Sequence, residues 1–163
     1  MANIGNWAYV LKSKLGVAIA RRGDDALKLA HSVRHLGDAY AYAGRWVRAE
    51  PCYVEALSIY RRHERTRPLD LANAIRSFAV LKDEVGATDQ SQSLWQEAHD
   101  LYVDLNVPAG IAESAARLAL LARQRGDLAR SRERLIEASA AADATDDPET
   151  LRYILKVTAQ LAT

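Results

Sequence analysis

The sequence predicts an all-α protein built from antiparallel helix hairpins that stack side by side. Three observations lead to this fold class. Long segments are rich in Ala, Leu, Arg and Glu, which are good helix formers. β-Branched residues do not alternate with polar ones over several positions, so strand signals are missing. Glycine and proline are sparse and recur at intervals, where they separate the helical segments.

Eight helices follow from these segments and breakers. They are expected over residues 4–22, 24–43, 46–64, 68–85, 88–105, 108–125, 128–143 and 148–162. Asp24 is expected to cap the second helix, because its side-chain oxygen can accept a hydrogen bond from an unpaired backbone N–H. Four glycines fall where a helix must end in a left-handed residue: Gly23, Gly44, Gly86 and Gly126. Three prolines fall near helix starts, where the missing N–H has no cost: Pro68, Pro108 and Pro148.

An internal repeat orders these helices into hairpins. The pairs Leu29-Ala30, Leu71-Ala72 and Ile111-Ala112 follow one another at nearly equal offsets, and Gly44, Gly86 and Gly126 keep the same offsets. Further columns share this register: Leu36, Phe78 and Leu118; Ala49, Ser91 and Ser131; Tyr53, Trp95 and Leu135; Ala56, Ala98 and Ala138. The small residues let neighbouring helices approach closely, and the large ones fill the space between them. Each hairpin leaves an apolar face that only another hairpin can cover.

These columns resemble the tetratricopeptide repeat. The matching residues are Leu36-Gly37, Tyr40, Gly44, Ala49, Tyr53 and Ala56. The segment GRWVRAEPCYVEAL, with Ala49-Glu50-Pro51, is similar to the longer repeat subtype of kinesin light chains, whose period matches the offset between the first two repeats here. The second repeat departs from the pattern at Lys82, where a tyrosine is usual. The resemblance implies a right-handed α-solenoid in one domain, with repeats at 29–70, 71–110 and 111–150. Residues 1–28 and 151–163 would form flanking helices.

The resemblance also implies a binding surface. In tetratricopeptide folds the first helix of each hairpin lines a concave groove. The positions that would face it, here called the groove set, are His31, Arg34, Asp38, Tyr42, Asn73, Arg76, Ser77, Val80, Glu113, Arg117, Leu120, Tyr153 and Lys156. Because Arg34, Arg76, Arg117 and Lys156 recur at about one per hairpin, they could meet the carboxylates of an acidic protein or peptide. A solvated charged face would show the same residues.

Composition excludes several function classes. The 22 basic and 21 acidic residues leave a net charge of +1, whereas a dedicated nucleic-acid binder usually has a large basic excess. No apolar run is long enough for a membrane span, and no secretory signal is visible. With Cys52 as the only cysteine, a cytoplasmic location is expected. The Ala- and Arg-rich composition suggests a bacterial source.

Catalytic and metal sites are weakly indicated. His31, His35 and Asp38 share one helix face at metal-ligand spacing, but no further ligand accompanies them. Cys52 is expected to be a small buried residue, and His63 and His99 to lie at the surface. We therefore expect no enzyme, cofactor or metal. The leading interpretation is an interaction scaffold. The alternatives are a sensor or regulatory segment of a larger signalling or transcription protein, and a metal protein or enzyme using the two histidines and Asp38.

The last helix carries more apolar residues than one contact face requires. Leu151, Ile154, Leu155 and Leu161 can face the preceding hairpin, whereas Tyr153 and Val157 lie off the centre of that stripe. A homodimer through this terminal helix is one hypothesis, and a covering downstream segment is the other.

Overall fold

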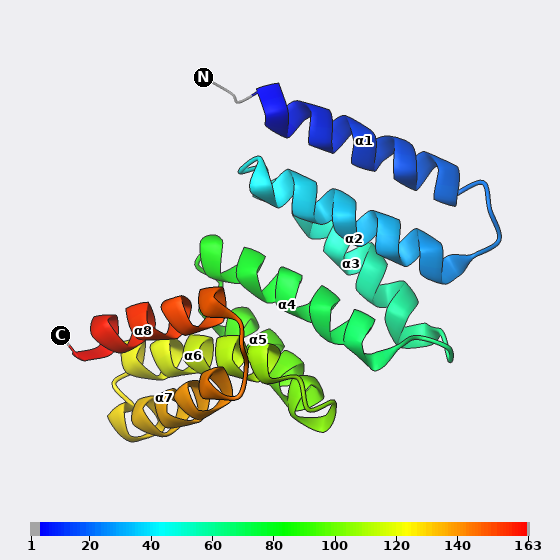
Figure 1. Cartoon of the computed structure of the whole chain (residues 1–163). Helices are drawn as coiled ribbons and strands as arrows, with labels where there is room; N and C mark the ends of the chain where they lie inside the picture. The colour runs from blue at the N-terminus through cyan, green and yellow to red at the C-terminus, as the bar shows by residue number, and fades with distance from the viewer. Residues whose placement is uncertain (1–3, 163) are drawn as a thin grey trace. The chain divides into compact units, whose positions relative to one another are not determined.

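A computed structural model describes residues 4–162 of the chain. Within this part it contains eight α-helices and no strand, in agreement with the predicted fold class. The bounds are α1 Ile4–Ala20, α2 Ala26–Tyr42, α3 Trp46–Arg62, α4 Pro68–Glu84, α5 Thr88–Asp104, α6 Pro108–Gln124, α7 Leu128–Asp143 and α8 Pro148–Ala162. Each end lies within two residues of its expected position (Figure 1).

Left-handed residues end three of the helices, as the repeat predicts. Gly44, Gly86 and Gly126 have φ values of 68°, 72° and 78°. After Gly44, the Arg45 N–H donates to the Tyr40 carbonyl at 2.8 Å, which satisfies a carbonyl that the helix leaves open. Gly23 does not have a positive φ, so the prediction for it was wrong.

One left-handed residue was not predicted. Asn106, with φ 51°, takes the same role after α5, where no glycine is available. Its short polar side chain tolerates this conformation better than most residues do.

The helix starts follow the expected chemistry with one correction. Pro68, Pro108 and Pro148 each occupy the first helical position. Asp25, and not Asp24, caps α2: its carboxylate accepts from the Lys28 N–H at 2.9 Å. Both aspartates offer the same oxygen, but α2 starts at Ala26, so only Asp25 lies immediately before the first helical residue.

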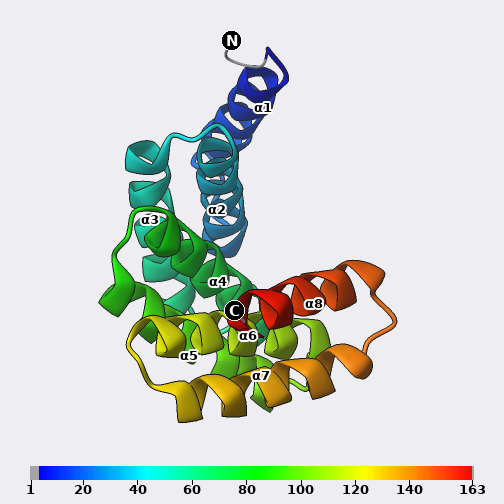
Figure 2. The same cartoon turned by 90° about the vertical axis from the view of Figure 1, so that its left-hand side faces the viewer.

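The helices form two compact units, residues 1–87 and 88–163, here called unit 1 and unit 2. In unit 1, α1 packs on α2, α2 on α3, and α3 on α4 (Figures 1 and 2). Its core contains Val10, Ala39, Tyr40, Ala49, Tyr53 and Leu81. Gly37 lies so close to Tyr53 that an added Cβ would come within 2.7 Å of its ring, which explains the glycine at this position.

In unit 2, α6 lies centrally and contacts α5, α7 and α8. Its core contains Ala112, Ala115, Ala116, Ala138, Ala142, Ile154 and Val157. Leu155 was expected to face this core and Val157 to lie off centre, but Val157 is buried and Leu155 is exposed. The buried stripe of α8 runs Ile154–Val157–Leu161, at spacings of three and four, so the stripe is rotated from the predicted one.

The small-residue columns lie at helix contacts, as predicted. Ala49, Ala56, Ala98 and Ala138 have no exposed surface, and Ser91 and Ser131 are also buried. No helix within residues 4–162 is long and apolar enough to cross a membrane.

Candidate functional site

The groove-set residues of unit 1 lie on α2 and α4, which contact each other. The partly buried members are Arg34, Asp38, Asn73, Arg76, Ser77 and Val80. His31 and Tyr42 are exposed. Partly buried polar side chains at the middle of a helix keep fixed positions while still reaching solvent, which suits a recognition surface.

Four polar side chains of α2 and one of α3 form a connected cluster, here called the histidine–arginine cluster: His31, Arg34, His35, Asp38 and Tyr53. Arg34 Nη1 donates to Asp38 Oδ2 at 3.1 Å, and the Tyr53 hydroxyl donates to Asp38 Oδ1 at 2.9 Å. Arg34 Nη2 lies 3.0 Å from His35 Nε2, and His31 Nε2 lies 3.0 Å from the same atom. Both contacts meet at His35 Nε2, and the other ring nitrogen, Nδ1, lies 3.5 Å from Asp38 Oδ2.

Charge states in this cluster follow from its contacts. Burial alone would raise the pKa of Asp38, but hydrogen bonds from His35, Tyr53 and Ser77 and the charge of Arg34 together lower it. Burial, the bonded Asp38 carboxylate and its charge raise the pKa of Tyr53. Burial, with His35 and Arg34 nearby, lowers the pKa of His31. At neutral pH the cluster therefore holds an ionised Asp38 and a neutral His31.

The geometry of the histidine–arginine cluster also concerns the alternative of a metal site at His31, His35 and Asp38. The Arg34 guanidinium occupies the approach to His35 Nε2, and a cation there would be repelled. Within residues 4–162, no three His, Cys, Asp or Glu side chains are grouped so as to hold a metal ion.

The groove-set residues of unit 2 lie on α6 and α8, which also contact each other. Glu113, Arg117, Leu120 and Tyr153 are partly buried, and Lys156 is exposed. The Arg117 guanidinium lies 5.7 Å from the centre of the Trp95 ring and 5.6 Å from that of Tyr153. Cation–π contacts on two rings hold this arginine within its own unit.

Unit 2 also contains a buried polar network that the sequence did not predict. His99 was expected at the surface, but it is 3% exposed, so that prediction was wrong. Its Nδ1 lies 3.0 Å from Ser114 Oγ, and its Nε2 lies 3.0 Å from both Arg134 Nη1 and Glu137 Oε1. The signal that could have located it is Leu57, which lies one repeat earlier at the equivalent position and is buried.

A serine, a histidine and a carboxylate in line resemble the constellation of acyl-transfer enzymes. The Ser114 side chain is 0% exposed, and its hydroxyl donates to the Gly110 carbonyl at 2.7 Å. A substrate carbonyl has no access to such an oxygen. Burial, which outweighs the attraction of Glu137, lowers the pKa of His99 and favours the neutral ring. The network therefore satisfies buried polar groups of unit 2 and provides no nucleophile.

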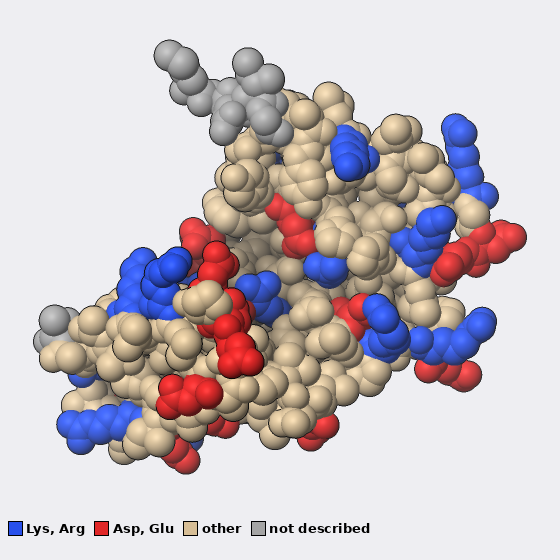
Figure 3. Space-filling model, viewed as in Figure 1, with Lys and Arg blue, Asp and Glu red and all other residues tan. Residues whose placement is uncertain are grey.

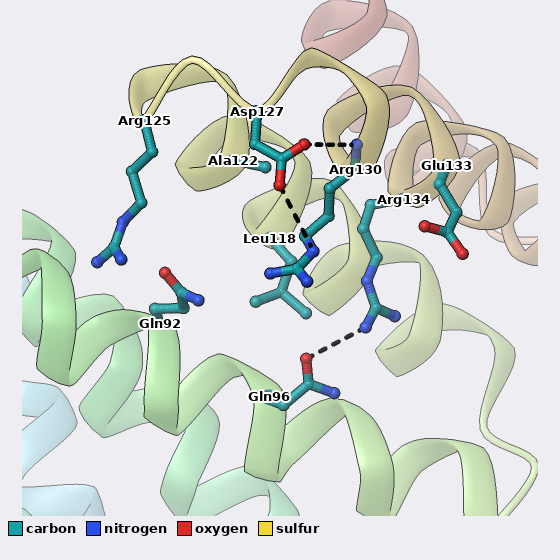
Figure 4. A pocket seen from close by; sticks show the side chains of 9 residues that line it. All are labelled: Gln92, Gln96, Leu118, Ala122, Arg125, Asp127, Arg130, Glu133 and Arg134. Carbon is teal, nitrogen blue, oxygen red and sulfur yellow. Dashed lines mark hydrogen bonds and ion pairs between the residues drawn. The ribbon is translucent and has the colours of Figure 1, made fainter.

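A pocket of about 390 Å³ opens beside this network, also within unit 2 (Figure 4). It is lined by Gln92 and Gln96 of α5, Leu118 and Ala122 of α6, Arg125 and Asp127 of the following turn, and Arg130, Glu133 and Arg134 of α7. None of these residues belongs to the groove set. The repeat pattern predicts helix contacts, but this pocket depends on long side chains at the α6–α7 turn, which the pattern does not position.

The charges around the pocket are largely paired. Arg125 forms an ion pair with Asp89, and Arg134 donates to Glu137 at 2.8 Å and to Gln96 at 3.1 Å. Asp127 accepts from the Arg130 N–H at 3.0 Å as the cap of α7. Because positive and negative groups alternate, the pocket has no strong field of one sign, and it suits a polar segment better than a highly charged anion.

Cys52 provides no nucleophile either. It was expected to be buried but is half-buried, and its Sγ donates to the Arg48 carbonyl at 3.4 Å. Burial, followed by the charge of Glu55, raises the pKa of its thiol. A neutral thiol is a weak nucleophile.

Comparisons with known proteins address the fold. The sequence matches no protein-family model and no curated protein. Among solved structures, the crystal structure of BtubC (BKLC) from P. vanneervenii is similar, with a TM-score of 0.71 and 20% sequence identity over 88% of this chain. The chain spans 59% of the length of that protein. At this identity the likeness shows the fold alone. The chain therefore has the helical solenoid fold of kinesin-light-chain-like tetratricopeptide proteins, in agreement with the long repeat seen in the sequence.

Proposed function

We propose that this chain is a non-catalytic scaffold that binds a segment of another protein through the first helices of its hairpins. The observation that carries the proposal is the histidine–arginine cluster on α2. Its hydrogen bonds fix Arg34, His35 and Asp38 in place, yet His31 is exposed and the side chains of Arg34 and Asp38 keep 16% and 28% exposure. A preorganised polar surface of this kind loses little side-chain entropy on binding.

The contacts of the arginines indicate what kind of partner segment would bind. Arg34 is paired with Asp38, and Arg117 lies against Trp95 and Tyr153, so each guanidinium is anchored within its own unit. A guanidinium has five N–H donors in a planar fork, which matches the two oxygens of a carboxylate. The preferred segment is therefore extended or helical, with a few acidic residues and with apolar residues that contact Val80 and Tyr42 in unit 1 or Leu120 in unit 2.

The inaccessible Ser114 and the neutral Cys52 thiol support a function without catalysis. We also propose a cytoplasmic bacterial setting, on composition alone, and no bound cofactor. A homodimer through α8 would have to use Leu155, since the other large apolar residues of that helix pack within unit 2.

A double variant tests the role of the arginines. Arg34→Ala with Arg76→Ala is expected to weaken binding of a partner recovered by pull-down by about 2 kcal/mol, with less effect at high salt. The matched control is Arg48→Ala with Arg62→Ala, two exposed arginines of α3. Calorimetry at two salt concentrations gives the affinities, and circular dichroism checks helicity. Equal affinity of both double variants and the parent, without salt dependence, would refute the proposal.

A further inference from the structure

The outer face of α1 carries a row of exposed apolar side chains. Trp7, Leu11, Leu15 and Ile19 are 43%, 60%, 63% and 57% exposed. Their spacing of four residues keeps them on one side of the helix, over a length of about 18 Å at 1.5 Å per residue. We call this row the outer stripe of α1. A continuous apolar surface of this kind is uncommon on a soluble protein without a binding partner.

The opposite face of α1 is already covered. Val10, Val17 and Ala20 are buried, and α1 packs on α2. In both views α1 is the outermost helix of unit 1 (Figures 1 and 2). Apolar residues on two opposite faces are typical of a helix that packs against other structure on both sides. Here the Arg45 guanidinium lies 4.1 Å from the centre of the Trp7 ring, and the rest of the second face is open to solvent.

Small residues indicate what kind of surface covers the stripe. Ala8 and Ala18 lie on the same side of the helix as the four large residues and are exposed. Elsewhere in this chain, alanines such as Ala56 and Ala98 occur where a second helix approaches closely. Insertion into a lipid surface gains from large apolar side chains, and small ones add little. The composition of the stripe therefore favours a helix as the occupant.

The charges beside the stripe identify the class of that helix. Lys12 and Lys14 lie on its two sides, and no acidic residue precedes Asp24 in the sequence. Along the course of α1 in Figure 3, the tan surface is interrupted by blue and not by red. A second copy, packed stripe to stripe, would place lysines against lysines, which opposes self-association.

We propose that the outer stripe of α1 docks an amphipathic helix of a different protein, one whose apolar face is edged by Asp and Glu. Its apolar residues would contact Leu11 and Leu15, and its carboxylates would pair with Lys12 and Lys14. This surface is separate from the histidine–arginine cluster, so the proposal does not depend on the function proposed above.

A designed peptide pair tests this proposal on the whole chain. The probe is a synthetic helix of about 20 residues, long enough to cover the stripe. It carries leucine at every fourth position, alanine beside the leucines on the same face, and glutamate on both flanks. Its twin has lysine in place of glutamate. Fluorescence anisotropy is expected to show saturable binding of the glutamate peptide, at least about tenfold tighter than that of its twin.

Two variants and one control separate the apolar and charged contributions. Leu11→Gln with Leu15→Gln should reduce binding at least about tenfold, because both leucines are exposed and their loss leaves the core intact. Lys12→Glu with Lys14→Glu should reverse the preference toward the lysine peptide. Ile136→Gln with Leu155→Gln, at residues 71% and 70% exposed in unit 2, should bind like the parent.

Four results would overturn the proposal. The glutamate peptide does not bind, or the leucine variant binds it as well as the control does. The parent forms a dimer that Leu11→Gln with Leu15→Gln abolishes, which identifies a second copy as the occupant. Vesicles of phosphatidylcholine and phosphatidylserine bind through the stripe where the peptides do not, which identifies a membrane surface.

Discussion

The two units accommodate buried polar groups in different ways on the same repeat. In unit 1, Arg34, Asp38 and Tyr53 are linked on a face that reaches solvent. In unit 2, His99 and Ser114 are linked within a core from which water is excluded. The unit 1 network, which reaches solvent, can exchange an internal hydrogen bond for one to a ligand. The buried unit 2 network would lose stability by such an exchange. Exposure thus determines whether a polar network is available for binding.

A second difference concerns packing. Tyr60 and Tyr102 are separated by one repeat, and so are Asp70 and Gly110, so each pair occupies equivalent repeat positions. In unit 2 the Tyr102 ring lies directly on Gly110. In unit 1 the corresponding Asp70 accepts from Arg67 at 2.8 Å at the start of α4. Unit 2 therefore depends on close helix approach at a point where unit 1 uses a charged contact.

The packing difference can be tested most strongly at Gly110. A Cβ added there would meet Tyr102 ring carbons at 2.5 Å, and the ring is 2% exposed and has no room to move. Gly110→Ala should destabilise the chain by about 3 kcal/mol in urea unfolding followed by circular dichroism. Gly16→Ala, with no atom within 4 Å of its Cβ, should stabilise α1 by about 0.5–1 kcal/mol. Equal effects of the two substitutions would contradict the close packing of α5 on α6.

The small-residue column can be tested at Ala98, which has no exposed surface. Ala98→Leu should overpack unit 2 and lower the free energy of unfolding by roughly 1–3 kcal/mol. Ala140→Leu, on the exposed side of α7, serves as the control and should have little effect. Unchanged thermal unfolding of Ala98→Leu would mean that the repeat register is wrong.

The buried network around His99 predicts that the free energy of unfolding depends on pH. Because burial lowers the pKa of His99 in the folded chain, the unfolded chain binds more protons as the pH falls through the ordinary histidine value of about 6.5. Stability should therefore be present at pH 8 and decrease toward pH 5.5. His99→Gln should cost about 1–2 kcal/mol at pH 8 and show a smaller decrease on acidification. Urea unfolding at several pH values measures both, and parallel curves for parent and variant would disprove the role of His99.

The smallest effect is expected in unit 1 for the substitution Lys82→Met. Its ammonium lies 2.5 Å from Glu50 Oε1 and 5.0 Å from the centre of the Phe78 ring, while its stem is buried. Lys82→Met keeps the apolar stem and leaves Glu50 partly hydrated, so stability should change by less than about 1 kcal/mol. Lys82→Ala removes the stem as well and should cost about 2 kcal/mol. If Met is as destabilising as Ala, the ion pair contributes more than the packing.

The sequence predicted the features that depend on local rules. Helix ends follow from glycine, proline and the repeat offsets, because their signals lie close in the chain to the structure they determine. The buried alanine columns follow from the same repeat. His99 was misplaced because its partners Ser114, Arg134 and Glu137 lie on two other helices, α6 and α7, and their hydrogen bonds have no periodic signature.

The candidate site was predicted only in part. Residue spacing placed His31, His35 and Asp38 on one face of α2, but it could not show that Arg34 would bond to both His35 and Asp38. The buried face of α8 was predicted incorrectly for a similar reason. Both Leu155 and Val157 fit an apolar stripe, and the packing of the preceding hairpin selected Val157.

The peripheral position of α1 has a kinetic consequence. Its main packing contact is with α2, whereas α6 is packed against three helices. Backbone amides of α1 should therefore exchange with deuterium through local opening, well before those of α6, which need a larger part of unit 2 to unfold. A helix docked on Leu11 and Leu15 would slow exchange in α1 specifically. Hydrogen exchange would then report occupancy of this surface even for a partner whose identity is unknown.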